Sequence, residues 1–138
     1  DHGKKAFNFD PALDAEASLR AFGRAYLEIV CRPDGGSAVR TVMAIAERMP
    51  DVGRRFYDRV IAHTMRLLAA YLTARVEAGE LAIDNCELAA AQYMRMCQAT
   101  LFEPYVFQAK PAPSKEQIAI VVDSAARLFL AGYRAPKS

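Results

Sequence analysis

The chain has 138 residues, which is enough for one domain with a sizeable core. Hydrophobic residues make up 53% and charged residues 25%, which excludes a disordered or fibrous protein. The formal net charge is only +2 and the arginines are spread along the chain, so this segment has no dense basic run for nucleic acid. No apolar run is long enough to cross a bilayer and the first residues lack a signal-peptide pattern, so we expect a cytoplasmic protein.

Residues that could carry redox, metal or catalytic chemistry are few. Cys31, Cys86 and Cys97 form an odd set without C-x-x-C spacing, which predicts reduced thiols and not a disulfide framework or a zinc site. No cluster of histidine, cysteine and carboxylate residues has the spacing of metal ligands. The sequence also contains no recognisable nucleophile–base pair and no glycine-rich phosphate loop. We therefore expect no metal, no cofactor and no enzyme activity.

Proline, glycine and capping signals divide the sequence into five helical stretches. None of them alternates like a strand, so we predict an all-α fold, an antiparallel bundle of about five helices. The first helix is expected to begin near Asp10–Pro11 or at Asp14, and to end before the loop at residues 32–36. The second is predicted from about Ser37 to Met49, where Pro50 stops it.

The remaining three helices are also bounded by recognisable signals. The third and longest is predicted from about Val52 to Ala78, with Asp51 as its cap and Gly79 at its end. A capping box formed by Asp84 and Glu87 predicts the start of the fourth, which runs toward Phe102 with Pro104 near its end. A second box at residues 114–117 predicts the fifth helix, which continues to about Tyr133.

The fourth and fifth helices are apolar over a wider arc than one neighbouring helix can cover. Such helices are either central in a monomeric bundle or covered by a second copy of the chain. The small residues Ala125, Ala126 and Gly132 would allow close helix approach and favour a homodimer. The candidate interface consists of polar, apolar and small residues of both helices: Gln92, Met96, Ile118, Val121, Val122, Ala125, Leu128, Phe129 and Gly132.

The order and spacing of four segments carry a family resemblance. These segments are Leu19–Leu27; Val42–Pro50, which leads to Phe56–Tyr57; Gly79–Leu81, followed by Asp84 and Glu87–Ala90; and Leu128–Tyr133. Together they resemble the C-terminal domain of TetR-family transcriptional regulators. The resemblance implies a homodimer that holds a small ligand in this part of the protein. It further implies that a helix-turn-helix head binds operator DNA and is released when the ligand binds.

Only about ten residues precede the first helix, and none of them supplies a recognition helix. We therefore interpret residues 1–13 as a leader or linker from a DNA-binding head outside this chain. Residues 14–134 are the predicted ligand-binding and dimerisation domain, and residues 135–138 a tail. The alternative is a small helical ligand-binding or protein-interaction module that acts alone, without any DNA function.

A ligand-binding bundle needs a cavity lined by apolar and aromatic side chains with a few polar groups. Methionines could line it adaptably, so we expect a small hydrophobic or aromatic effector. For each candidate, plain core packing is the favoured alternative. A satisfied, half-buried histidine is favoured for His63, and inert burial is favoured over redox sensing for Cys97. The candidates are Phe22, Tyr26, Val42, Met43, Ile45, Phe56, Val60, His63, Leu67, Tyr93, Met94, Cys97 and Leu101.

Overall fold

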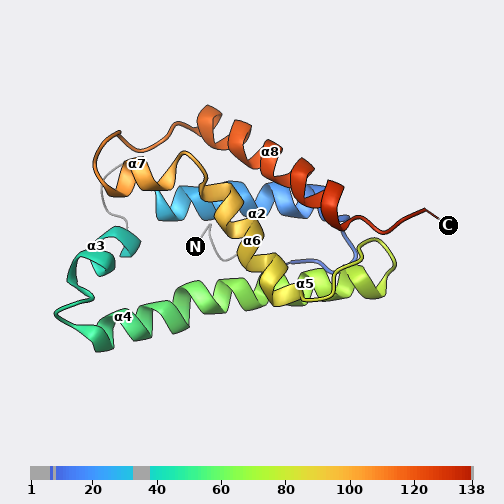
Figure 1. The fold of residues 1–138 in the computed structure, drawn as a ribbon, viewed down its shortest axis with the longest axis horizontal. Helices are drawn as coiled ribbons and strands as arrows, with labels where there is room; N and C mark the ends of the chain where they lie inside the picture. The colour runs from blue at the N-terminus through green and yellow to red at the C-terminus, as the bar shows by residue number, and fades with distance from the viewer. Residues whose placement is uncertain (1–6, 8, 33–37, 138) are drawn as a thin grey trace.

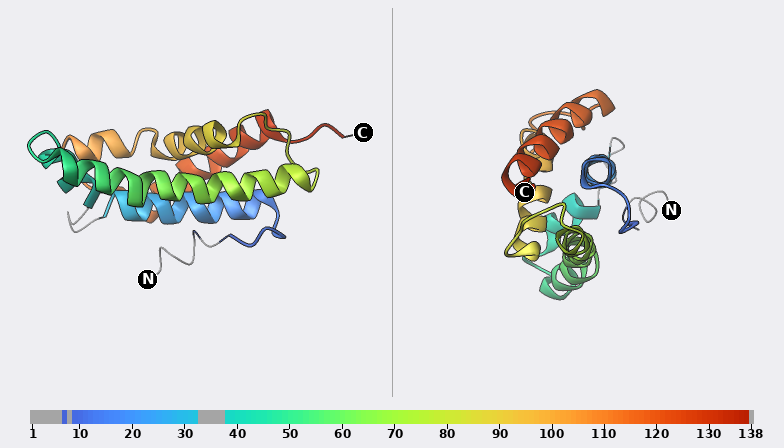
Figure 2. Two further views of the ribbon diagram at one scale, coloured as in Figure 1. Left: turned by 90° about the horizontal axis from the view of Figure 1, so that it is seen from below. Right: turned by 90° about the vertical axis from the view of Figure 1, so that its right-hand side faces the viewer.

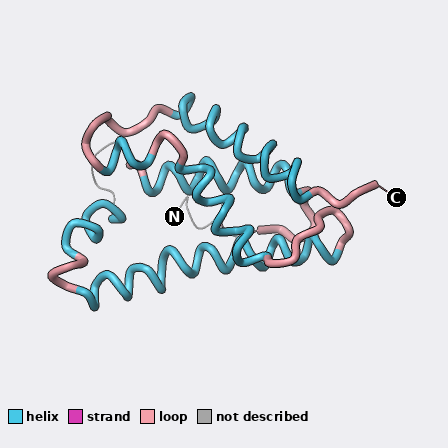
Figure 3. Tube along the Cα trace, in the orientation of Figure 1, coloured by secondary structure: helices cyan, strands magenta, loops and turns pink. Residues whose placement is uncertain are grey.

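The computed structural model describes residues 7, 9–32 and 38–137. Within these ranges all of the regular secondary-structure elements are helices. An isolated antiparallel bridge joins Leu81 to Arg134 (Figure 1, Figure 3). The predicted all-α bundle is confirmed. None of the helices in the described ranges combines the length and the apolar character that crossing a bilayer requires.

The first two helices differ from each other in how well their ends were predicted. Helix α2 (Ala15–Val30) begins at the Asp14 cap, whose carboxylate accepts a hydrogen bond from the backbone N–H of Ala17. Helix α3 (Ala38–Ile45) is shorter than predicted, because the chain already turns at residues 46–48 and does not continue to Met49. The predicted start of α3 at Ser37 lies outside the described residues.

One long rod follows, built from α4 (Pro50–Phe56), the π-helix η1 (Tyr57–Ile61) and α5 (Ala62–Glu77), as Figure 2 shows. It starts earlier than predicted because Pro50 itself occupies its first turn, where a missing N–H costs nothing. The predicted Asp51 cap is therefore wrong, and Asp51 instead pairs with Arg54 inside that turn. At the other end Gly79 adopts a φ of 85° and ends the rod as predicted.

The next helix, α6 (Cys86–Gln98), departs from its prediction at both ends. Its cap is Asn85, whose side chain accepts from the Leu88 N–H at 3.0 Å, so the predicted Asp84–Glu87 capping box is wrong by one residue. It ends at Gln98 and not near Phe102, because Thr100 has a φ of 63°, which no helix can contain. A separate short helix, α7 (Phe102–Val106), follows this break.

The last helix, α8 (Lys115–Tyr133), has the predicted capping box. The Ser114 hydroxyl accepts from the Gln117 N–H at 3.1 Å, and the Gln117 side chain accepts from the Ser114 N–H at 2.8 Å. The C-terminal end of α8 is joined to the loop after α5, where the Ala82 N–H donates to the Tyr133 carbonyl at 2.8 Å. These contacts hold α8 along the bundle.

Helices α2, α5, α6 and α8 pack into what we call the packed half of the molecule (Figure 1). Gly23 lets α2 approach α8, because a Cβ there would lie 2.7 Å from Cγ1 of Val122 and 3.0 Å from Sγ of Cys97. The buried hydroxyl of Tyr93 is satisfied by donating to the Leu19 carbonyl at 2.6 Å. This half therefore has a close-packed interior.

Helices α3 and α4, together with η1 and α7, form what we call the open end. Among their described residues only Val39 of α3 and Tyr105 of α7 are buried, and α4 and η1 bury none. The Tyr105 hydroxyl donates to the Arg32 carbonyl at 3.0 Å, and the Arg40 guanidinium lies 4.8 Å from the Tyr105 ring centroid. These contacts join α7 to the segment just after α2 and to α3. The helices of the open end are therefore held together by polar contacts more than by a hydrophobic core of their own.

Candidate ligand-binding cavity

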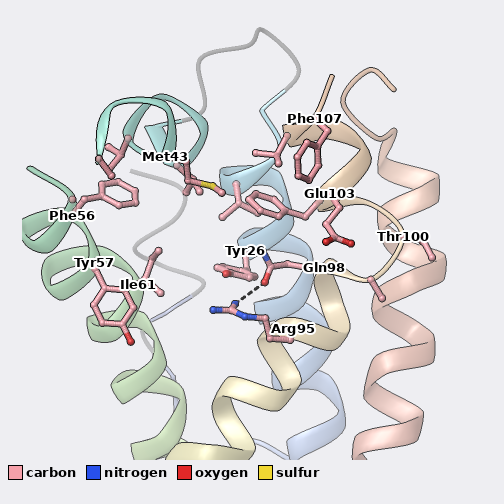
Figure 4. Close-up of a pocket in the computed structure, with 18 residues that line it drawn as sticks. Tyr26, Met43, Phe56, Tyr57, Ile61, Arg95, Gln98, Thr100, Glu103 and Phe107 are labelled. Atoms are coloured by element: carbon pink, nitrogen blue, oxygen red, sulfur yellow. Dashed lines mark hydrogen bonds between the residues drawn. The ribbon is translucent and has the colours of Figure 1, made fainter. Parts of the chain in front are cut away.

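A cavity of about 750 Å³ lies between the open end and the packed half (Figure 4). Residues from α2, α3, α4, η1, α6 and α7 and the adjoining turns surround it. Most of them are apolar or aromatic, which is the usual lining of a small-molecule site. The lining consists of Tyr26, Val30, Val39, Val42, Met43, Ala46, Gly53, Phe56, Tyr57, Ile61, Arg95, Gln98, Ala99, Thr100, Phe102, Glu103, Val106 and Phe107.

The structure brings part of the sequence-predicted set together in this cavity: Tyr26, Val42, Met43 and Phe56. The others lie elsewhere. Four of them, Phe22, Tyr93, Met94 and Cys97, belong to the core of the packed half. Leu101 lines a separate cavity of about 290 Å³ between α7 and α8, Ile45 and Leu67 are partly buried outside the cavity lining, and Val60 and His63 are exposed.

The π-helix η1 explains why Val60 and His63 point away from the cavity. In a regular α-helix, residues four and seven positions after Phe56 share its face, and these are Val60 and His63. A π-turn inserts an extra residue, so the face of Phe56 is continued by the residue five positions later. That residue is Ile61, which lines the cavity together with Tyr57.

The largest group of lining residues that sequence reasoning missed lies in the segment after α6. The sequence predicted one continuous helix through this region, whereas the turn at Thr100 folds α7 across the cavity. Pro104 was a usable signal, since proline is tolerated only in the first turn of a helix and therefore indicates a new start. The missed residues are Val30, Val39, Ala46, Gly53, Tyr57, Ile61, Arg95, Gln98, Ala99, Thr100, Phe102, Glu103, Val106 and Phe107.

Three polar side chains gather at one side of the cavity, and we call Tyr26, Arg95 and Gln98 the polar corner (Figure 4). The Arg95 guanidinium donates to Oε1 of Gln98 at 2.6 Å. Burial raises the pKa of Tyr26, and the positive charge of Arg95 opposes that rise only in part. The Tyr26 phenol is therefore neutral near pH 7 and can donate a hydrogen bond.

Large apolar side chains remain uncovered around the opening of the cavity. Met43 is 55% exposed, Tyr57 is 51% exposed and Phe107 is 77% exposed, although all three line it. They come from α3, from η1 and from the residue after α7, so they surround the opening from different sides (Figure 4). Apolar surface of this kind gains free energy when another apolar group covers it.

The buried cysteines lie outside the cavity. Burial raises the pKa of the Cys97 thiol to about 12 and that of Cys31 to about 11, so both stay protonated near pH 7. Across the part of the chain that the structure describes, no three histidine, cysteine or carboxylate side chains cluster as a metal site would need.

The predicted dimer residues divide between the interior and the surface. Ile118, Val122, Ala125 and Phe129 are buried within their own chain, because they form the stripe of α8 that packs on α2 and α6. Their placement on a free interface is therefore corrected. Of the rest, Met96 and Val121 are partly buried, whereas Gln92, Leu128 and Gly132 are exposed.

A family model for the C-terminal domain of AefR-like transcriptional repressors matches residues 17–135. This range includes all of the helices described above except the first residues of α2. The chain belongs to this family. As a member of the AefR-like family, a branch of the TetR regulators, it is the C-terminal regulatory domain of a transcriptional regulator.

Solved structures of other regulators share the fold of this AefR-like domain. A protein described as a TetR-family transcriptional regulator from Mesorhizobium loti is 20% identical, with a TM-score of 0.82 over 96% of this chain and 64% of its own. The flavonoid-responsive regulator FrrA is 22% identical, with a TM-score of 0.78 over 99% of this chain and 71% of its own.

A TetR-family regulator from Pseudomonas syringae pv. tomato is 17% identical, with a TM-score of 0.74 over 98% of this chain and 70% of its own. No curated protein matches the sequence. The chain thus spans less than two thirds of the length of the Mesorhizobium protein.

Proposed function

We propose that this domain binds a small hydrophobic or aromatic effector in the cavity beside the polar corner. The observation that carries the proposal is the cavity itself, whose volume of about 750 Å³ falls within the range typical of small-molecule sites. Its wall is largely apolar, and the few polar groups converge from α2 and α6. An effector would also cover the exposed rings of Tyr57 and Phe107.

The domain is proposed to pair with a second copy through the outer faces of α6 and α8. Leu88, Ile120 and Leu128 are large apolar residues on these faces, and they are 53%, 70% and 64% exposed. Gly132 has no atom within 4 Å of the position its Cβ would take, so a helix could approach closely there. Two copies joined by α6 and α8 would form a four-helix contact and cover these side chains.

Effector binding is proposed to act on DNA through a head joined before α2. A series of aromatic contacts supports this route. Tyr26 of the cavity stacks on Phe22 with ring centroids 5.8 Å apart, and Phe22 in turn contacts Phe9 at 5.6 Å and Phe7 at 5.2 Å. A shift of Tyr26 on effector binding would reach the segment that precedes α2, and a repressor would thereby release its operator.

The cavity can be tested by titrating the chain with planar aromatic compounds, among them a flavonoid because FrrA is flavonoid-responsive. We expect saturable binding by calorimetry, and weaker binding after Met43→Glu, which places a charge in the apolar wall. Val60→Glu, at an exposed position of η1 outside the cavity lining, is the matched control and should leave the affinity unchanged. Equal affinities for the chain and its Met43→Glu variant would contradict the assignment of the site.

Pairing can be tested by light scattering. The Leu128→Glu substitution places a charge on the outer face of α8, and we expect it to convert a dimer into a folded monomer. Val60→Glu introduces the same charge on η1, away from α6 and α8, and should leave the dimer intact. A dimer that survives Leu128→Glu together with Ile120→Glu would show that another surface pairs.

A further inference from the structure

The unused hydrogen-bonding capacity of the polar corner consists of donors. Arg95 carries five N–H groups, and its hydrogen bond to Gln98 together with its contact with the Tyr26 hydroxyl uses only part of them. Gln98 accepts that bond through its oxygen, so its amide N–H₂ group is left as a donor. The neutral hydroxyl of Tyr26 adds another. A ligand that matches this corner must supply acceptors.

Within the described part of the chain, no carboxylate forms an ion pair with the guanidinium at this corner. Arg95 is the only cationic residue in the described lining, and none of the ion pairs among the described residues includes it. Arg20, Arg54 and Arg75, in contrast, each face a carboxylate. The remaining charged group of the lining is Glu103, and Figure 4 shows the Gln98 side chain between Glu103 and the Arg95 guanidinium.

The walls beside this corner are aromatic on two sides. Phe56 and Tyr57 lie on the long rod, whereas Phe102 and Phe107 lie on and after α7 (Figure 4). Aromatic side chains on two sides favour a flat ring system, because offset and edge contacts between rings add to the gain from burial. A planar guanidinium likewise matches a carboxylate, which it can bind through two parallel hydrogen bonds.

We propose that the effector of this domain is an aromatic carboxylate, whose carboxylate binds Arg95 and whose ring lies between the rod and α7. Gln98 and Tyr26 supply further donors to the same carboxylate. The proposal rests on the ligand-binding function proposed above and names the chemical class that this site selects.

The test compares 2-naphthoic acid with its neutral isostere 2-naphthamide by calorimetry at neutral pH. We expect the acid to bind about 10-fold more tightly or better, as a charge-assisted hydrogen bond would give. The substitution Arg95→Gln should remove this preference and leave the affinity for the amide within about 2-fold, whereas Arg95→Lys should retain part of it. Arg59→Gln, an exposed position of η1 outside the lining, is the matched control and should keep the full preference.

Each failure has a distinct meaning. Equal binding of acid and amide, unchanged by Arg95→Gln, would overturn the carboxylate proposal and leave the ligand-binding function standing. An equal loss of both ligands in Arg95→Gln would also overturn it, because Arg95 would then only shape the cavity. If octanoic acid binds as tightly as 2-naphthoic acid, the proposal that the effector carries an aromatic ring would be overturned. Binding of none of the three compounds would contradict both the proposal and the function on which it rests.

Discussion

The packed half and the open end of this domain are built from similar helices but are closed in different ways. In the packed half, Phe22, Tyr93 and Phe129 are buried by neighbouring helices on every side. At the open end, Met43 and Phe107 line a cavity and are still more than half exposed. The difference indicates that helices of similar composition can either bury their large side chains within the chain or leave them around a cavity, where a ligand could cover them.

The sharpest contrast is expected between two phenylalanine truncations. Phe22→Ala should lower the free energy of unfolding by about 3–5 kcal/mol, because it opens a void in a fully packed core. Phe56→Ala, at the half-buried wall of the cavity, should lower it by about 1 kcal/mol or less, since solvent can enter the space that is left. Urea denaturation measures both values. Similar losses at the two positions would remove the distinction between the two regions.

Two glycines of the packed half should respond to the same substitution with opposite signs. Gly23→Ala should cost about 1–3 kcal/mol, because its Cβ would lie 2.7 Å from Val122 in a tightly packed interior. Gly132→Ala should stabilise a monomeric chain by up to about 1 kcal/mol, since the site is open and alanine favours a helix. Both glycine substitutions are measured by thermal unfolding in the Leu128→Glu variant. Because that variant is expected to be monomeric, the measured effects do not include a change in pairing. A neutral Gly23→Ala would indicate looser helix packing than described.

The loss of stability when a polar contact is removed should also differ between the two regions. Glu80 accepts from the Ala15 N–H at 3.0 Å and from Nε of Arg75 at 2.7 Å, and both ion-pair partners are largely buried. Glu80→Ala should cost about 1–2 kcal/mol, because a helix-end donor and a partly buried cation lose their acceptor. Asp51→Ala breaks an exposed pair with Arg54 at the open end and should cost about 0.5 kcal/mol or less. Equal costs would contradict this difference.

The smallest perturbation is chemical labelling of the thiols. Burial raises the pKa of Cys97 to about 12 and that of Cys31 to about 11, so below these values both thiols are protonated and unreactive. With iodoacetamide at about pH 8, mass spectrometry should show Cys86 modified first, because it is only partly buried. As the pH rises, Cys31 should react before Cys97. Early labelling of Cys97 would mean that the packed half opens readily.

The fold could be predicted where local chemistry determines it. Asp14, Gly79 and Ser114 mark helix ends through side-chain caps or a positive φ, and each was recognised from the sequence. The choice between Asp84 and Asn85 as a cap could not be made in this way, because both side chains can accept the same kind of hydrogen bond. Helix boundaries therefore remained uncertain wherever two capping residues are adjacent.

The cavity could be predicted only in part, because apolar spacing is the same in a core and in a cavity wall. The candidates Tyr26 and Met43 line the cavity, whereas the candidate Phe22 has the same spacing and fills the core. The π-turn of η1 has no sequence signature, so the change of face from Val60 to Ile61 appeared only in the structure. Arg95 was not among the sequence candidates, because charge alone does not show what a side chain faces.

Hydrogen–deuterium exchange with and without 2-naphthoic acid tests most directly whether the open end is the binding region. We expect added protection in α3, in α4 and η1, in α7 and at the C-terminal end of α6, where the cavity lining lies. The α5 and α8 segments, which contribute no residue to that lining, should exchange at unchanged rates. Protection confined to the packed half, with α3, η1 and α7 unaffected, would contradict the account.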